Sequence, residues 1–256
     1  MTVLVVRESD VFSRILQENG FAVVNCPTIK TEPLEDLSDF QAKISSLEKY
    51  DGIFLTSRNA AEILRDGLRK SGVRFGGKVY VLGKRSFEIL KDENLDLKFF
   101  ETANRAEEML AAIPSKDLEG GRFLFVRGEK SLRTIPEFLK KSGAITDETV
   151  VYRTVQIAVE DCKIKEISEI LESGEVLCAC FFSPSAAENF LRQFGAEKLH
   201  RTKIAAIGET TAGFLEKFNL RADFVAAKAT AEDFALELSE YLKRIPPAKD
   251  AKKIFV

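Results

Sequence analysis

The chain has 256 residues, of which 45% are hydrophobic and 30% charged, and its formal net charge at pH 7 is −2. This length is enough for one large domain or two ordinary ones, and the composition is that of a globular protein. Because proteins that bind duplexes carry a basic surplus, the near-neutral charge argues against nucleic acid as a partner.

Short apolar runs alternate with amphipathic stretches along the chain. The runs predict strands at residues 3–6, 21–26, 52–55, 78–82, 97–100, 123–126, 148–152, 176–182, 203–207 and 222–225. Several are apolar on both faces, as strands are in a covered parallel sheet. Between them, apolar residues recur every three or four positions, for example over 60–68 and 186–194, which predicts helices. This alternation indicates an α/β fold with doubly wound parallel sheets.

The chain shows no sign of export, a membrane span or a metal site. The first residues read as a strand rather than a signal peptide, and no apolar run approaches the ~20 residues of a spanning helix. We therefore expect a cytoplasmic protein without a membrane partner. The lone His200 excludes a zinc site with two or more histidines. Buried reduced thiols are expected at the four cysteines, none in C-x-x-C spacing: Cys26, Cys162, Cys178 and Cys180.

The two halves of the chain repeat the same motifs in the same order. The segments FLTSRNAAE (54–62) and VYVLG (79–83) correspond to CFFSPSAAE (180–188) and IAAIG (204–208). A weaker match joins LVVRE (4–8) to LFVRGE (124–129). Nearly constant spacing indicates an internal duplication.

The repeated halves need not be the spatial domains. Residues 27–36, with two prolines, and residues 149–157 have extended character, and each follows the second strand of its half. Two such crossings predict one lobe from residues 1–33 plus 156–256 and another from residues 34–155. We expect the working site between these lobes.

Polar residues follow the repeated strands, where ligands bind in doubly wound sheets. Asn59 and Ser185 each precede a glutamate by three positions, which is capping-box spacing at a helix start. Helix starts keep unpaired N–H groups that suit anions. The residues just ahead are expected to face a ligand: Thr56, Ser57, Arg58, Ser183 and Pro184.

Other strand ends leave two interpretations open. Gly83 and Gly208 follow apolar strands, where a glycine either makes a tight turn or lets a ligand approach the backbone. Arg7 and Arg127 are either solvated strand ends or clamps for an anion. Tyr152, on the second crossing, either packs in a strand or reaches the ligand.

The chain lacks the usual nucleotide and hydrolase motifs. There is no G-x-G-x-x-G after the first strand, no G-x-x-x-x-G-K-[ST] and no G-x-S-x-G. Hydroxyls, backbone amides and arginines remain, and these are suited to binding and orienting an anion.

Together, five motifs resemble the uroporphyrinogen-III synthase family over nearly the whole chain. They are FLTSRNA (54–60), VRGE (126–129), VYRT (151–154), FFSPSA (181–186) and AAIGETTA (205–212). The resemblance implies two flavodoxin-like lobes joined by a two-stranded β-ladder. It also implies a cofactor-independent, monomeric hydro-lyase that cyclises hydroxymethylbilane to uroporphyrinogen III, with loss of water and inversion of ring D.

The resemblance implies roles for individual residues. Tyr152 is the candidate proton donor near the departing hydroxyl, and Thr210 and Thr211 match a threonine pair of the family. The predicted substrate-binding residues are Arg7, Thr56, Ser57, Arg58, Asn59, Gly83, Arg127, Gly128, Ser183, Pro184, Ser185, Gly208, Thr210 and Thr211.

Two other functions fit parts of this pattern. A non-catalytic two-lobed binder of a tetrapyrrole or other polycarboxylate would use the same groups without turnover. A pair of receiver-like domains would need a phosphorylatable aspartate at a strand end. Because Thr56, Ser57, Arg127 and Ser183 occupy the strand ends, the receiver interpretation is disfavoured.

Overall fold

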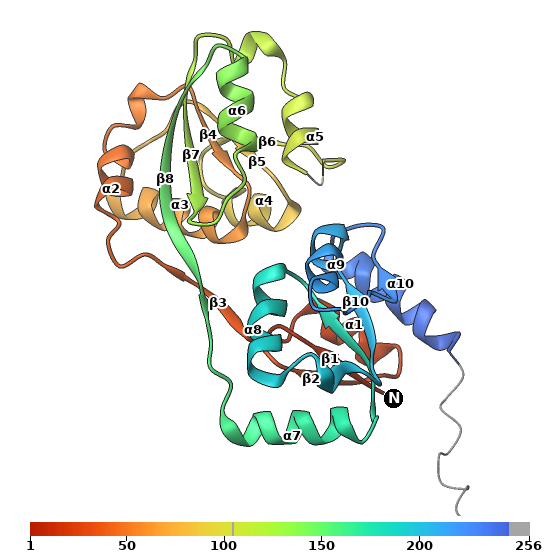
Figure 1. The fold of residues 1–256 in the computed structure, drawn as a ribbon. Helices are drawn as coiled ribbons and strands as arrows, with labels where there is room; N and C mark the ends of the chain where they lie inside the picture. The colour runs from red at the N-terminus through yellow and green to blue at the C-terminus, as the bar shows by residue number, and fades with distance from the viewer. Residues whose placement is uncertain (104, 246–256) are drawn as a thin grey trace, which may run out of the picture. The chain divides into compact units, whose positions relative to one another are not determined.

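A computed structural model describes residues 1–103 and 105–245 (Figure 1). The chain divides into two compact units. Unit 1 joins Met1–Lys30 to the chain from Gln156 onward, and unit 2 is Thr31–Val155. The first boundary therefore comes slightly earlier than residue 33, where the sequence placed it.

Unit 1 is built on a five-stranded parallel sheet in the order β11-β10-β9-β1-β2. Its strands are β1 (Thr2–Val5), β2 (Ala22–Asn25), β9 (Val176–Phe181), β10 (Lys203–Ala206) and β11 (Phe224–Val225). Its helices are α1 (Val11–Glu18), α7 (Asp161–Glu172), α8 (Pro184–Phe194), α9 (Glu209–Glu216) and α10 (Ala231–Lys243), with a 3-10 turn η3 (Glu197–Leu199).

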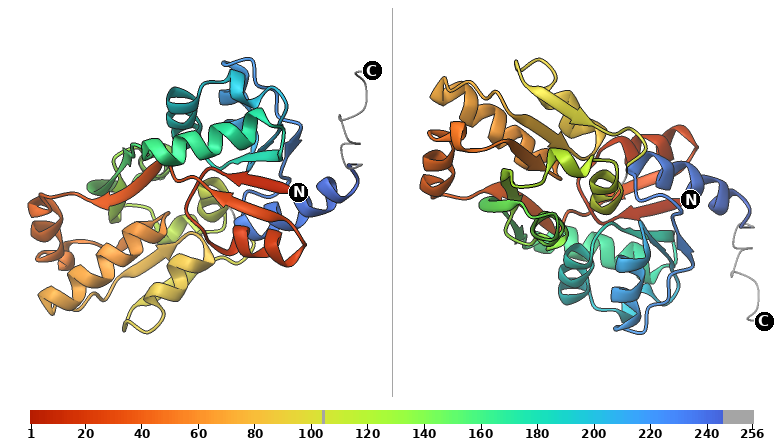
Figure 2. Two further views of the ribbon diagram at one scale, coloured as in Figure 1. Left: turned by 90° about the horizontal axis from the view of Figure 1, so that it is seen from below. Right: turned by 90° about the horizontal axis from the view of Figure 1, so that it is seen from above.

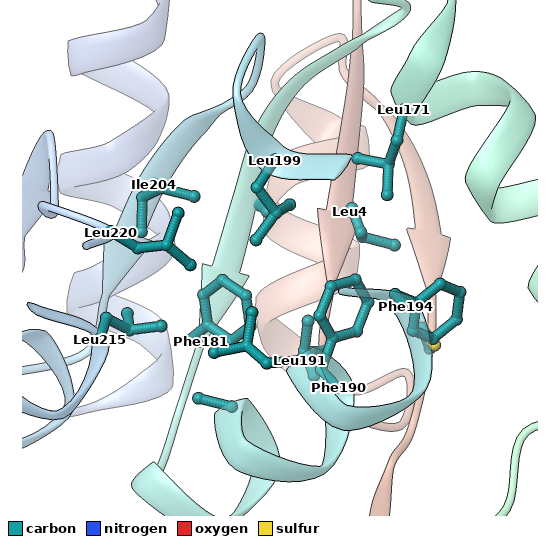
Figure 3. Packing of buried hydrophobic residues seen from close by; sticks show 14 of the residues in the cluster. Leu4, Leu171, Phe181, Phe190, Leu191, Phe194, Leu199, Ile204, Leu215 and Leu220 are labelled. Atoms are coloured by element: carbon teal, nitrogen blue, oxygen red, sulfur yellow. The ribbon is translucent and has the colours of Figure 1, made fainter. Parts of the chain in front are cut away.

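Both faces of this sheet are covered because its strands are apolar on both sides. Leu4 and Phe181 pack with residues of α7, α8 and α9, including Phe190 (Figure 3). Val3 and Val5 point to the opposite face, against α1 and α10. The views in Figure 2 show the red strands β1 and β2 between the green α7 and the red α1.

Unit 2 contains nearly all of the second sheet, in the order β3-β8-β7-β4-β5-β6; the start of β3 and the last residue of β8 lie outside the unit. Its strands are β3 (Ile29–Pro33), β4 (Gly52–Leu55), β5 (Lys78–Val81), β6 (Asp96–Phe99), β7 (Arg122–Gly128) and β8 (Ile145–Gln156). Helices α2 (Ser38–Ile44), α3 (Arg58–Ser71) and α4 (Lys84–Leu90) cover one face, and α5 (Ala106–Ala111) and α6 (Thr134–Lys141) the other. Two 3-10 turns are η1 (Leu47–Lys49) and η2 (Ser115–Asp117).

The repeated motifs occupy equivalent strands of the two sheets. The order β2-β1-β9-β10-β11 in unit 1 corresponds to β8-β7-β4-β5-β6 in unit 2. In unit 1 the first two strands precede the other three along the chain, whereas in unit 2 they follow them. The two sheets therefore share a spatial order of strands, although the chain passes through those strands in a different sequence in each unit.

The two crossings pair with each other as β3 and β8. Ile157 N donates to Thr28 O at 2.8 Å and Leu34 N donates to Val151 O at 3.0 Å, so the two segments run antiparallel. Pro33 ends β3, which lies at the edge of the sheet, where a missing N–H is tolerated.

Each predicted strand range overlaps an observed strand, and an α/β fold with parallel sheets is confirmed. β3 is the strand that the sequence indicated only as an extended segment. Three cysteines are buried as expected, whereas Cys162 is exposed on α7.

Candidate functional site

The predicted site residues of unit 1 follow the carboxyl ends of its parallel strands. Val6 N donates to Cys180 O, and Ile207 N donates to Phe181 O, both at 3.0 Å, so these strand ends are level with one another. Arg7, Ser183 and Gly208 come directly after them. This carboxyl edge therefore brings together residues that are far apart in the sequence.

Ser183, and not Ser185, is the N-cap of α8. Its backbone is extended (φ −161°, ψ 155°), and its Oγ accepts from Ala186 N at 3.2 Å. Pro184 occupies the first helical turn, where its missing N–H costs nothing. Ser185 lies inside the helix, with its Oγ 3.3 Å from that of Ser183. The capping-box prediction at Ser185 was wrong.

The same correction applies to α3 in unit 2. Ser57 is the N-cap, with φ −149° and ψ 149°, and its Oγ accepts from Ala60 N at 3.2 Å. Asn59 is already in the first helical turn. Arg58 is exposed, and its Nε lies 3.8 Å from Glu62 Oε1. The Ser57 hydroxyl hydrogen is not used by the cap and can donate to a ligand.

Gly83 and Gly208 both precede helices but differ in backbone conformation. Gly83 has φ 86°, the left-handed region that favours glycine, so a turn alone explains it. Gly208 is extended, with φ 178° and ψ 172°. An added Cβ at either position would meet no described atom within 4 Å. The turn therefore does not require a glycine at residue 208, which leaves open space beside its backbone.

The two strand-end arginines already have carboxylate partners. Arg7 Nη2 lies 2.9 Å from Asp10 Oδ2, and the Arg7 Cζ lies 4.4 Å from the centre of the Phe182 ring. Arg127 Nε donates to Glu148 Oε2 at 2.7 Å. Both guanidinium groups are therefore ion-paired, and their role in binding an anion stays a prediction.

The hydroxyl residues of the two edges differ in exposure. Thr210, in the first turn of α9, is exposed, whereas Thr211 is only 3% exposed. Thr56 and Ser57 in unit 2 are half-buried. Of the threonine pair, Thr210 is the one open to a ligand.

Tyr152 lies in β8 beside the carboxyl end of β7. Where β7 pairs with β8, Arg127 lies opposite Val150 but Gly128 lies opposite Tyr152. Val151 is therefore an extra residue, and β8 forms a bulge there. The Tyr152 ring packs partly against the core on the α3 face of the sheet. Its hydroxyl has no hydrogen-bond partner among the described residues and can therefore donate.

Glu148 was missed by the sequence reasoning. It accepts from Arg127 Nε and also from Arg133 Nη1, at 2.8 Å. The residue lies within a predicted strand, but its partners approach from a neighbouring strand and a loop. No local pattern reports such a pairing.

The described residues hold no group of three or more metal-binding side chains, and none of their helices is long and apolar enough to cross a membrane. The exposed cations Arg58, Lys84 and Arg85 lie at the starts of α3 and α4. Together with the helix amides, they can hold carboxylates and can orient a bound anion.

A family model described as "Uroporphyrinogen-III synthase HemD" matches residues 10–235. A uroporphyrinogen-III synthase of Chlorobaculum parvum is 32% identical over 251 residues, covering 94% of this chain and 99% of that protein.

Two solved structures share the fold. A mutant uroporphyrinogen III synthase of Thermus thermophilus aligns with a TM-score of 0.62 at 18% identity, covering 96% of this chain and 100% of that one. Uroporphyrinogen-III synthetase of Helicobacter pylori aligns with a TM-score of 0.61 at 18% identity, covering 94% and 99%.

Proposed function

The chain belongs to the uroporphyrinogen-III synthase family, and we propose that the carboxyl edges of its two sheets bind hydroxymethylbilane, the linear tetrapyrrole that this family cyclises. The chain is thus an enzyme of tetrapyrrole biosynthesis. The observation that carries the activity is 32% identity over 94% of the chain to a relative of that name. The proposal includes a monomeric, cytoplasmic enzyme that needs no cofactor.

The units correspond to the family's two flavodoxin-like lobes, with β3 and β8 as the ladder. The strand order supports this, because β2-β1-β9-β10-β11 reproduces the flavodoxin order 2-1-3-4-5. Unit 2 has the same spatial arrangement as β8-β7-β4-β5-β6, but its chain order is permuted and β3 is added at the edge. In that topology ligands bind beyond the carboxyl ends of the strands. The hydroxyls, glycines and cations described above all follow those ends.

The substrate's charge matches unit 2 in particular. Every pyrrole ring carries an acetate and a propionate, so the substrate is a polyanion. Arg58, Lys84 and Arg85 offer positive charge beside helix starts, whose dipoles also favour anions. In unit 1, Ser183, Gly208 and Thr210 offer hydroxyls and backbone N–H groups. Each edge would bind a different part of the substrate.

Tyr152 donates the proton that is needed when the hydroxyl group leaves the substrate. The hydroxymethyl C–O bond breaks with the electron pair leaving on oxygen, and the Tyr152 O–H donates a proton so that water departs. The pyrrole nitrogen supplies the electrons, giving an azafulvene that is attacked by ring D. The attack comes from the substituted α-carbon of ring D and forms a spiro intermediate. The bond from this carbon to the methylene of ring C then breaks, and the methylene rebonds to the free α-carbon of ring D. The proton lost from that carbon returns to the tyrosinate, and ring D is left inverted. The remaining residues contribute by holding the chain bent.

The test is an isomer assay on the purified chain. With hydroxymethylbilane as substrate, the type III isomer should form faster than the spontaneous background of type I. Heat-denatured protein is the control. If only type I appears at the background rate while the protein still binds the substrate, the chain is a binder and the proposal is wrong.

A further inference from the structure

The surroundings of Gly128 indicate a role other than substrate contact. Gly128 is buried, and a Cβ added to it would lie 2.5 Å from Cζ, 2.6 Å from Cε2 and 2.8 Å from the hydroxyl oxygen of Tyr152. Its φ is not in the left-handed region, so the backbone would admit an alanine. The three atoms nearest to such a Cβ all belong to Tyr152, so a side chain at residue 128 would meet this ring first.

We infer that Gly128 is a positioning residue: together with the bulge of β8, it places the Tyr152 hydroxyl for proton donation. This inference rests on the proposed role of Tyr152. It reassigns Gly128, which the sequence had placed among the substrate contacts. The residue acts on the reaction through the tyrosine ring that lies over it.

The bulge explains how the ring reaches that position. Successive residues of a strand point to opposite faces, and Val151 is fully buried in the core on the α3 face. Tyr152 would therefore point to the other face of a regular strand. Because β8 slips by one residue between its pairings with Arg127 and Gly128, Tyr152 packs against the same core as Val151. Bulges turn side chains in this way beside active sites.

The Arg127 side chain binds the backbone at the end of β7, next to the bulge of β8. Its Nη1 donates to Gly128 O at 2.9 Å and to Glu129 O at 3.2 Å, while its Nε binds Glu148 of β8. Glu129 N in turn donates to Tyr152 O at 2.9 Å. The end of β7 is thus fixed to β8 on both sides of the glycine, which holds the Gly128 backbone against the strand that carries Tyr152.

The first test is a cycle of turnover measurements on Gly128→Ala, Tyr152→Phe and the double variant. Gly128→Ala should lower kcat by up to the order of 10²-fold, the range of a lost proton donor. In the Tyr152→Phe background the same change should cost less than about 2-fold, because no hydroxyl remains to misplace. An equal loss in both backgrounds would show that Gly128 acts directly on the substrate.

The second test observes the tyrosine itself. With 13Cζ-labelled tyrosine, the chain gives four signals, and that of Tyr152 is identified by its loss in Tyr152→Phe. Gly128→Ala should shift this signal, whereas Gly76→Ala, where an added Cβ meets nothing within 4 Å, should not. An unmoved Tyr152 signal in Gly128→Ala would overturn the inference whatever the activity.

A rescue experiment covers a variant that fails to fold. Tyr152→Ala removes the ring and makes room for a Cβ, so Gly128→Ala should lower the melting temperature much less in that background. Loss of folding in both backgrounds would contradict a clash with the ring. If Tyr152→Phe keeps full turnover, the donor role fails, but the signal shift and the rescue still decide whether Gly128 positions the ring.

Discussion

The carboxyl edges of the two sheets share a scaffold but differ in charge. Each helix start after the central strand is capped by a serine, Ser57 or Ser183. After the cap, unit 2 continues with Arg58 where unit 1 has Pro184. The pairs that follow the turn glycines differ in the same way, Lys84-Arg85 in unit 2 against Glu209-Thr210 in unit 1.

We interpret this difference as a duplication in which the scaffold was kept while the residues proposed to bind the ligand diverged. Amides and hydroxyls at equivalent positions are retained because they cap helices and end strands in both units. The cations at the helix starts, Arg58, Lys84 and Arg85, and the tyrosine belong to unit 2, whose edge therefore suits carboxylates and proton donation. The edge of unit 1 offers hydroxyls and open backbone, so the two edges would bind the substrate unequally.

The largest effect is expected at Tyr152, which has no counterpart at the edge of unit 1. Tyr152→Phe should lower kcat on the order of 10²-fold, because a positioned proton donor contributes at least that much. Tyr80→Phe is the matched control, since the Tyr80 hydroxyl is buried with no hydrogen-bond partner among the described residues, and its loss should not reduce turnover. Wild-type turnover in Tyr152→Phe would remove the donor role.

The charge difference predicts a smaller effect on binding. Arg58→Ala should raise KM up to about 5-fold, the scale of one exposed ionic contact, and the effect should fade as salt screens it. Arg65→Ala, further along the same helix, is the control. A KM that stays at the wild-type value in low salt would mean that Arg58 does not meet the substrate.

The serine caps predict equal effects in both units. Ser57→Ala and Ser183→Ala should each lower the free energy of unfolding by about 1 kcal/mol, because each leaves a helix N–H without its acceptor. Asn59→Ala and Ser185→Ala should change it by less than about 0.5 kcal/mol. Denaturant unfolding measures the stability of all four variants. Larger losses in Asn59→Ala and Ser185→Ala than in the other two would support the capping boxes predicted from the sequence.

Alkaline pH should weaken unit 1 before unit 2. Burial raises the pKa of Cys26 from 9.0 to about 12, with Lys163 opposing, and also raises that of Cys180. In unit 2, burial and then a hydrogen bond to Asp147 raise the pKa of Tyr50 from 10.0 to about 12. A raised pKa favours the neutral form, so stability is complete below the unfolded value and lost as pH rises toward the folded one.

The loss should therefore begin near pH 9 in unit 1 and near pH 10 in unit 2. In the wild type the free energy of unfolding should fall as pH rises, and Cys26→Ala should make this fall less steep between pH 9 and about pH 12. Tyr50→Phe should make it less steep only between pH 10 and about pH 12. Unfolding curves recorded across this range provide the test. Identical pH profiles for Cys26→Ala and the wild type would contradict the assignment to the buried thiol.

The sequence predicts most of the fold because strands and helices are local patterns. Alternating apolar runs placed ten strand ranges, and the repeat identified equivalent strands. The caps were misplaced because the spacing of Asn59 to Glu62 satisfies a pattern, whereas the helix starts where φ and ψ first turn helical, after Ser57. Spacing alone does not specify that residue.

The site was harder to predict because its decisive contacts are non-local. Glu148 neutralises an arginine that the sequence offered as a clamp, and Gly128 lies under a ring from the next strand. A bulge that shifts the register by one residue brings Tyr152 to Gly128. None of these contacts produces a recognisable pattern in the local sequence of the residues that make it.

Amide chemical-shift mapping with uroporphyrinogen III under anaerobic conditions tests the central claim most directly. The account predicts that the shifts gather at both carboxyl edges, around Ser57 and Gly83 in unit 2 and around Ser183, Gly208 and Thr210 in unit 1. Shifts confined to one unit, or to the amino ends of the strands, would contradict it.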